Sequence, residues 1–234
     1  WLEEKPACTQ CGDTGYVQGG VCPCLRAYYA REQLAELSRL LPLGEDSFET
    51  FSFDWYDSAV QPAFGISPRE NMERNYDVCR DYAYQFAKGS GDLLLSGGTG
   101  LGKTFLSACI ARVVSENGFS VVYDTAASVF SRFEDAKFRR DDGGSEDADR
   151  CMRCDLLILD DLGTEMTTSF VQSALYQIVN GRLMAGRSTI ISTNLAPEEI
   201  GSRYGRSVLS RLEGEYEILP FFGEDIRRLK RERQ

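Results

Sequence analysis

The sequence predicts an α/β fold in which a parallel sheet is flanked by helices. Short runs of Leu, Ile and Val alternate with segments of helical periodicity from residue 92 onward. Strands that are apolar at nearly every position are buried on both faces, as in a parallel sheet covered by helices. A chain of 234 residues, 42% hydrophobic and 26% charged, suffices for one such domain with a small appendage.

The order of the elements follows from these patterns. Ser67 and Glu70 form a capping box with Pro68 at the first helical position, which predicts a helix from there to about residue 88. The acidic, Gly-bearing stretch 141–149 is expected to be a loop. The predicted strands cover residues 92–96, 119–125, 155–160, 188–193 and 215–219, and the predicted helices between and after them cover 104–116, 126–137, 168–185 and 205–213.

Composition excludes several classes of function. The net charge of −10 disfavours a protein that coats duplex DNA or an anionic membrane through its overall field. Apolar runs are far shorter than the roughly 20 residues that span a bilayer, and no signal segment opens the chain, so we expect a cytoplasmic protein without a membrane partner. The absence of histidine removes Ser-His-Asp and Cys-His nucleophiles and all imidazole metal ligands.

Four cysteines near the start of the chain have metal-ligand spacing. Cys8, Cys11, Cys22 and Cys24 supply four soft ligands within a Gly-rich stretch that cannot build an apolar core. Four thiolates suit a closed, tetrahedral zinc site that contributes folding energy. Disulfides would require an oxidising compartment, and an iron–sulfur cluster has no electron-transfer context here. We therefore predict a four-cysteine zinc module over 1–26, a helix and aromatic linker over 27–66, and the α/β domain over 67–234.

A Gly-rich turn after the first predicted strand of the sheet is typical of phosphate binding. It matches G-x-x-x-x-G-K-[ST] and opens a helix, so backbone N–H groups and the positive helix end would surround a polyphosphate. Lys103 would pair with the β and γ oxygens of ATP, and Thr104 would hold Mg²⁺. A turn that binds nothing is the less favoured alternative. The loop comprises Gly97, Gly98, Thr99, Gly100, Leu101, Gly102, Lys103 and Thr104.

Polar side chains follow two further predicted strands. Asp160 and Asp161 end the strand over 155–160, and parallel strands present such groups to the ligand crevice. Asp160 is predicted to hold magnesium, and Asp161 to position or deprotonate the attacking water. Asn194 follows the next strand and would orient that water and sense the γ-phosphate if the two strands are neighbours. A loop-capping role is the alternative for Asn194.

Four segments together are similar to a known group. GGTGLGKT, LLILDDLGTE, IISTNL and GRSVLSRLEGEY occur in this order. Over about residues 45–234 the chain resembles the AAA+ ATPases of the DnaC/DnaI helicase-loader and IstB transposition-helper group. The resemblance implies ATP hydrolysis with Mg²⁺, self-assembly in the ATP state, a replicative DNA helicase as partner and contact with single-stranded DNA. The four-cysteine module also resembles that of DnaI-type loaders, and other interpretations are a transposition helper acting on duplex DNA and an ATP-gated adaptor with little hydrolysis.

The resemblance also implies roles for arginines. Arg211, or alternatively Arg206, matches the arginine that completes a neighbour's ATP site, and Arg227, or alternatively Arg228, matches a cis arginine on the phosphates. Two departures stand out. Asp161 replaces the usual Glu, so hydrolysis is expected to be slow, and only about 15 residues follow residue 219, so the helical lid is expected to be reduced.

Two remaining features have competing interpretations. Aromatic and basic residues between the second and third strands of the sheet are a candidate path for single-stranded DNA, with an amphipathic helix as the alternative. Cys151 and Cys154 have redox spacing, but a buried structural role is favoured because no thioredoxin-like pattern surrounds them. The predicted DNA path consists of Phe133, Lys137, Phe138, Arg139 and Arg140.

Overall fold

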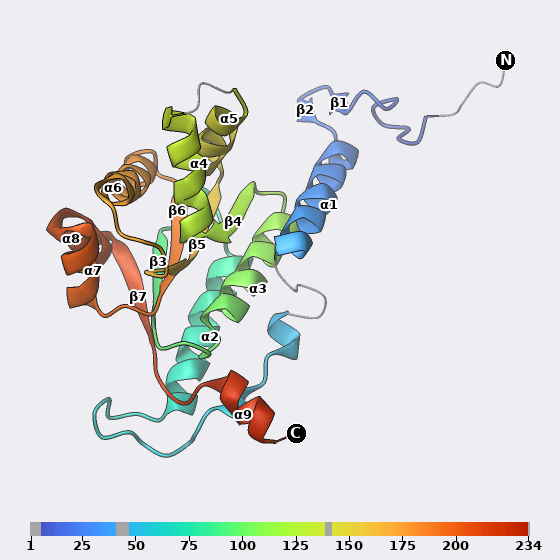
Figure 1. Cartoon of the computed structure of the whole chain (residues 1–234). Helices are drawn as coiled ribbons and strands as arrows, with labels where there is room; N and C mark the ends of the chain where they lie inside the picture. Colours follow the sequence, from blue (N-terminus) through green and yellow to red (C-terminus); the bar gives the residue numbers. More distant parts are fainter. Residues whose placement is uncertain (1–5, 41–46, 139–141, 234) are drawn as a thin grey trace.

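A five-stranded parallel sheet forms the centre of the computed structural model, which describes residues 6–40, 47–138 and 142–233 (Figure 1). The strand order is β4-β5-β6-β3-β7, so the strand that precedes the Gly-rich loop lies between β6 and β7. The predicted α/β class is therefore confirmed. The strands are β3 (Asp92–Gly97), β4 (Val121–Thr125), β5 (Leu156–Leu162), β6 (Ser188–Thr193) and β7 (Tyr216–Phe221).

Helices cover both faces of the sheet and create two apolar cores (Figure 1). Successive side chains of a strand point to opposite faces. Leu93 and Leu95 accordingly pack with α2 (Pro68–Tyr84) and α3 (Lys103–Glu116). Leu94 packs on the other face. The helices of that second face are α4 (Ala126–Phe138), α5 (Asp142–Arg153), α6 (Ser169–Met184), α7 (Pro197–Tyr204) and α8 (Arg206–Glu215).

Two of these helices differ from the expectations. The stretch 141–149 was expected to be a loop, and this is wrong over residues 142–149, which lie in α5. This helix is stabilised by tertiary contacts, because Cys151 is fully buried and Arg182 of α6 donates to the carbonyl oxygen of Cys151 at 2.7 Å. Helix α7 was not predicted, although Pro197 at its first position and Glu199 in its first turn are ordinary start signals.

Polar groups converge at one edge of the sheet because parallel strands end on the same side. β5 pairs with β6 and β6 with β3, so the predicted neighbour relation between the strands bearing Asp160 and Asn194 is confirmed. The Gly-rich loop follows β3, the next strand along. Three strand ends therefore meet at a single place.

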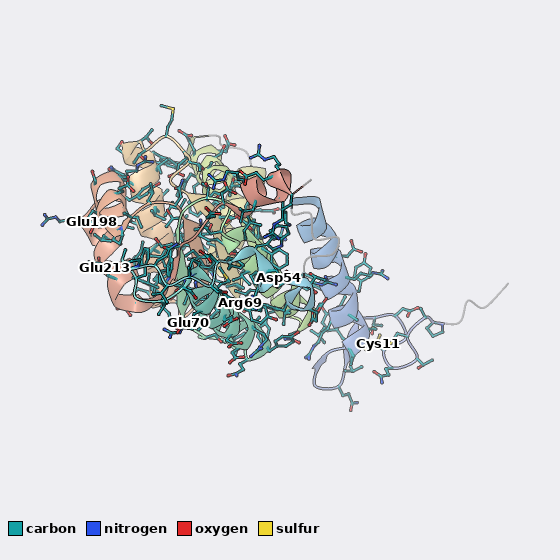
Figure 2. The ribbon with its side chains drawn as sticks, turned by 90° about the horizontal axis from the view of Figure 1, so that it is seen from below. Cys11, Asp54, Arg69, Glu70, Glu198 and Glu213 are labelled. Carbon is teal, nitrogen blue, oxygen red and sulfur yellow. The ribbon has the colours of Figure 1, made fainter. Side chains whose placement is uncertain are left out.

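The amino-terminal module lies away from the sheet. It contains a two-stranded antiparallel sheet of β1 (Tyr16–Val17) and β2 (Gly20–Val21). This sheet leads into α1 (Pro23–Leu40), which runs beside α3 (Figure 1). Cys11 lies at the opposite end of the molecule from Glu198 and Glu213 on α7 and α8 (Figure 2). None of the described helices is long and apolar enough to cross a membrane.

An aromatic segment, residues 47–56, connects the amino-terminal part to the sheet. It forms two short 3-10 helices, η1 (Phe48–Thr50) and η2 (Phe53–Trp55). Phe48 and Tyr56 are buried in the same core as α2 and α3, and the Phe51 ring lies edge-on to Phe105 of α3 with centroids 5.4 Å apart. The segment is thus fastened to the first turn of the helix that follows the Gly-rich loop.

A candidate nucleotide site at the strand ends

A cavity of about 420 Å³ lies where the strand ends meet. Four parts of the chain form its wall: the aromatic segment, the phosphate loop (residues 97–104) with the start of α3, the ends of β5 and β6, and the final helix α9 (Ile226–Glu232). Such a volume is in the range of small-molecule sites. The lining residues are Thr50, Phe51, Ser52, Trp55, Tyr56, Thr99, Gly100, Leu101, Gly102, Lys103, Thr104, Phe105, Ala108, Asp161, Thr164, Asn194, Ile226, Arg227 and Lys230.

The phosphate loop adopts a backbone that requires glycine. Gly97, Gly100 and Gly102 have φ angles of +150°, +69° and +97°, which side chains rarely adopt. Close neighbours reinforce the requirement, since a Cβ on Gly97 would lie 2.0 Å from the carbonyl oxygen of Phe221. The Tyr56 hydroxyl donates to the Leu101 carbonyl at 3.1 Å, so the aromatic segment supports the loop from outside.

Lys103 is held inside the loop. Its ammonium group donates to the carbonyl oxygens of Gly97 at 2.7 Å and Gly98 at 2.6 Å, and the residue is 5% exposed. Burial lowers the pKa of Lys103, while the negative charges of Asp161 and Asp160 act in the opposite direction. The ammonium is therefore pre-positioned next to the amides that would receive phosphate.

The two acids at the end of β5 have different surroundings. Asp161 lines the cavity with a left-handed φ of +56°, an uncommon conformation for a residue other than Gly. Burial and the Asp160 charge raise the pKa of Asp161, and Lys103 and Arg227 lower it. Asp160 is 4% exposed and is not among the described residues that line the cavity. Its carboxylate accepts hydrogen bonds from the hydroxyls of Tyr123, at 2.5 Å, and Ser192.

Asn194 and Thr104 complete the polar part of the wall. Both line the cavity, Thr104 from the first turn of α3 and Asn194 from the end of β6. Hydroxyl and carboxylate oxygens are the ligands that Mg²⁺ prefers, and Thr104 and Asp161 supply both kinds on one cavity. These residues fit a hydrated magnesium ion bound with a polyphosphate.

Helix α9 forms part of the cavity wall and contacts the phosphate loop. The N–H of Ile226 donates to the Gly100 carbonyl at 3.0 Å, and Asp225 caps the helix by accepting from the Arg227 N–H at 2.8 Å. Arg227 lines the cavity, whereas Arg228 forms exposed ion pairs with Glu224 and Glu232. Of the two predicted arginines, Arg227 is the one brought to the site.

The same helix also contacts the aromatic segment. The Lys230 ammonium lies 5.5 Å from the centroid of the Trp55 ring, and the Arg233 guanidinium lies 4.5 Å from it. Both distances are typical of cation–π contacts. Helix α9 therefore joins the phosphate loop at one end to the aromatic segment at the other.

The two candidate trans arginines lie on α8, and neither is among the described residues that line the cavity of their own chain. The Arg211 guanidinium lies 5.5 Å above the Tyr176 ring of α6 and 3.4 Å from its hydroxyl oxygen. Arg206 lines a separate hollow between α7 and α8 together with Glu198 and Glu213. Figure 2 labels these two glutamates. Both positions are compatible with contact to a second copy.

The predicted DNA path is only partly within the described residues. Phe133 is half-buried against the second core, and the Lys137 ammonium lies 5.3 Å from the Phe170 ring centroid. The side chain of Phe138, together with Arg139 and Arg140, lies outside the described residues. The path stays a prediction.

The amino-terminal cysteines converge as a metal site requires. The ligand sulfur atoms of Cys8, Cys11, Cys22 and Cys24 lie within 4.8 Å of one another, with Cys8–Cys22 at 3.8 Å and Cys11–Cys24 at 3.4 Å. Zn–S bonds of about 2.3 Å in a tetrahedron place sulfurs about 3.8 Å apart. Hydrogen bonding from the Cys11 backbone and the Cys24 thiol lowers the pKa of Cys8 to about 7, which favours the metal-binding thiolate. The donor set fits zinc.

The other cysteines are buried. Cys79, Cys109, Cys151 and Cys154 are all at most 4% exposed. Burial raises the pKa of Cys151 to about 11, which keeps its thiol protonated and unreactive at neutral pH. These facts favour the structural interpretation over redox chemistry.

Several residues of the site were not predicted from the sequence. Tyr56 and Trp55 line the cavity without belonging to a motif, and Thr164 lines it from within the LLILDDLGTE segment but was given no role. Tyr123 and Ser192 contact Asp160 from neighbouring strands. The aromatic cluster was noticeable in the sequence, but nothing in its spacing indicated a ligand wall. Thr164 lies in the turn directly after the two acids, which was the available signal.

Comparison with known proteins agrees with this geometry. A family model described as "IstB-like ATP binding protein" matches residues 77–234, more than half of the chain. The Escherichia coli K12 protein described as "Uncharacterized protein YdaV" is 31% identical over 161 residues, covering 63% of this chain and 64% of that protein. The replicative helicase loader DnaC of the same organism is 30% identical over 135 residues, covering 57% and 54%. The match thus spans roughly half to two thirds of these relatives.

Comparison of the fold with solved structures also finds a DnaC protein. The crystal structure of the DnaC helicase loader superposes with a TM-score of 0.60 at 20% identity, over 75% of this chain and 98% of that one. This likeness confirms the predicted arrangement of a parallel sheet flanked by helices. From the matched family model and the cavity built by its motifs, we conclude that the chain belongs to the IstB-like ATP-binding family.

Proposed function

We propose that the protein is a P-loop AAA+ ATPase that binds ATP with Mg²⁺, assembles on itself, and loads a replicative helicase onto single-stranded DNA. The observation that carries the proposal is the convergence of Lys103, Thr104, Asp161, Asn194 and Arg227 on one cavity. Phosphoryl transfer depends mainly on positioning and charge neutralisation, and this set supplies both.

Each residue of the cavity has a role in the proposal. Lys103 and Arg227 neutralise phosphate charge, and Thr104 with the acids of β5 would hold the magnesium ion, which would offset the negative charge of the β- and γ-oxygens. Asp161 and Asn194 orient the attacking water. The aromatic segment with Trp55 forms the apolar part of the wall.

The nucleotide part is tested by Lys103→Ala, with the exposed Lys88→Ala as the matched control. Two charge-assisted hydrogen bonds to phosphate contribute about 3 kcal/mol, so affinity for a fluorescent ATP analogue should fall about 100-fold. Lys88→Ala should bind as the wild-type protein does. Unchanged affinity in Lys103→Ala would remove the assignment.

The trans arginine is tested by mixing two inactive variants. Arg211→Ala should bind ATP but lose turnover, and Lys103→Ala should lose binding. In the mixture, Lys103→Ala subunits supply Arg211 to neighbours whose own nucleotide site is intact, so phosphate release should partly recover. Replacing Arg211→Ala with Arg206→Ala in the same mixture distinguishes the two arginines, because only the residue that acts in trans gives complementation.

The partner is tested by capture from host lysate with a non-hydrolysable ATP analogue. Retention of a hexameric helicase supports the loader, and retention of a transposase supports the transposition helper instead. DnaC is a replicative helicase loader by its description, and the zinc module resembles that of DnaI-type loaders, so the loader is the preferred alternative. DNA binding should then prefer single strands, which a titration with single- and double-stranded oligonucleotides measures.

A second candidate is an ATP-gated adaptor with little hydrolysis. It is favoured by one specific observation, the carboxylate of Asp161, whose side chain is one methylene shorter than that of Glu. A phosphate-release assay with and without single-stranded DNA separates the two functions. If Asp161→Glu accelerates release several-fold, the short side chain limits hydrolysis in the wild-type protein.

A further inference from the structure

Asp160 is held from both sides by hydroxyl groups on the neighbouring strands. The Tyr123 hydroxyl of β4 donates to one carboxylate oxygen at 2.5 Å, and the Ser192 hydroxyl of β6 donates to the other. β4 and β6 flank β5 in the sheet. The carboxylate is therefore fixed by two donors that come from opposite directions.

The two donors are themselves immobile. Tyr123 is 4% exposed with its ring in the core beneath α2 and α3, and Ser192 is fully buried. The Ser192 hydroxyl also accepts from the backbone N–H of Asp161 at 3.0 Å. One side chain thus contacts both acids and holds the backbone at the residue whose φ is +56°.

The Asp160 carboxylate can accept further hydrogen bonds beyond these two. An ionised carboxyl group has about four lone-pair sites, and the hydroxyls occupy one on each oxygen. Buried carboxylates need such donors, since an uncompensated charge is costly in the interior. The free lone pairs can accept from water molecules around a cation, but the group cannot rotate to follow the cation.

We propose that Tyr123 and Ser192 are positioning residues of the magnesium site, which rests on the proposed function. Their hydroxyls hold Asp160 in one orientation, as an acceptor for water bound to the metal, and Ser192 at the same time directs Asp161 toward the cavity. Side chains that hydrogen-bond to a metal-binding residue hold that residue in its orientation, and their loss typically weakens metal binding 10- to 100-fold.

Tyr123→Phe is the sharpest test because it removes one donor and leaves the ring in the core. Tyr82→Phe is the matched control, because the Tyr82 hydroxyl donates to the Gly91 carbonyl at 3.1 Å, at the other end of β3 from the phosphate loop. A merely structural hydroxyl would lower stability in either variant. Only a positioning role changes the affinity for the metal.

The probe is Mn²⁺, and free Mn²⁺ is counted by electron paramagnetic resonance with a saturating non-hydrolysable ATP analogue. Correcting for Mn²⁺ bound to the analogue alone, we expect about a tenfold loss of affinity in Tyr123→Phe and no change in Tyr82→Phe. Binding of the analogue in EDTA should be the same in all three proteins. Ser192→Ala, which leaves Tyr123 in place, should also weaken Mn²⁺ binding.

A double-mutant cycle assigns the effect to Asp160. In an Asp160→Asn background, Tyr123→Phe should weaken Mn²⁺ binding less than twofold, because the positioned carboxylate is already gone. Wild-type Mn²⁺ affinity in Tyr123→Phe, or an equal loss in Tyr82→Phe, would overturn the inference and leave the proposed function intact. A wild-type protein that binds no Mn²⁺ with the analogue would overturn both.

Discussion

Gly100→Ala is predicted to disturb the contact between the phosphate loop and α9. Gly100 has a φ of +69°, and a Cβ built on it would lie 2.0 Å from Oδ1 of Asp225 and 2.4 Å from its Cγ. Asp225 must therefore move. That movement breaks its cap on the Arg227 N–H, now 2.8 Å long, at the start of the helix that carries a cavity-lining arginine.

The magnitude follows from two contributions. A side chain in the left-handed region costs about 1–2 kcal/mol, and loss of a helix cap costs about 1 kcal/mol. The free energy of unfolding should thus fall by about 2–3 kcal/mol. At about 2–4 °C per kcal/mol for a chain of this size, the melting temperature should fall by about 4–12 °C.

Gly186→Ala is the control that isolates the backbone contribution. Gly186 has a similar φ of +61°, and a Cβ there meets nothing within 4 Å. Its cost should be about 1–2 kcal/mol, without effect on the affinity for an ATP analogue. Gly100→Ala should also weaken that affinity, since it displaces Arg227.

A double-mutant cycle with Asp225→Ala tests the steric argument. In that background the cap is already lost and the obstacle is gone, so Gly100→Ala should cost only what Gly186→Ala costs. Chemical denaturation gives the four free energies. Additive effects of the two substitutions, or equal destabilisation by Gly100→Ala and Gly186→Ala with unchanged nucleotide affinity, would refute the reasoning.

Three further predictions concern stability. Arg182→Met should lower the free energy of unfolding by about 3–5 kcal/mol, measured by urea denaturation. The fully buried Arg182 guanidinium donates to the carbonyl oxygens of Cys151, Cys154 and Ser188, which would lose this donor in the variant. A loss below about 1 kcal/mol would contradict this prediction. Burial raises the pKa of Asp92 from 3.8 to about 6, so between these values the folded protein binds this proton and the unfolded chain does not. The free energy of unfolding should therefore fall by up to about 3 kcal/mol as pH rises from about 4 to 6. Denaturation at several pH values should show that Asp92→Asn lacks this decrease, and the same pH dependence of stability in the variant and the wild-type protein would argue against it. Chelation of zinc should unfold the four-cysteine module while the melting transition of the α/β domain stays within a few degrees, as followed by metal analysis and calorimetry; joint unfolding would show that the module supports the domain.

The fold and the backbone of the phosphate loop were predictable because their signals are local. The loop from Gly97 to Thr104 needs glycine at particular backbone angles, so its motif can be recognised without knowing which residues pack against it. Buried parallel strands can also be recognised in the sequence, because both of their faces must be apolar. The order of β5 and β6, assumed when Asn194 was assigned to the site, then brought three strand ends together.

Helix α5 illustrates where local signals fail. Its sequence is acidic and contains two adjacent glycines, which indicate a loop. The structure forms a helix there because Cys151 packs into the second core and Arg182, distant in sequence, donates to carbonyl oxygens at the helix end. Tertiary contacts outweigh weak propensity in such a segment.

By itself, then, the sequence determined the sheet, the phosphate loop, the cysteine cluster and the identity of the acids at the end of β5. Only the tertiary structure decided which groups surround them: Tyr56 against Leu101, Asp225 against Gly100, and the hydroxyls of Tyr123 and Ser192 on Asp160. These partners lie more than 30 residues apart along the chain. No periodicity or short motif encodes such distances, because strand order and packing bring the partners together only once the cores have formed.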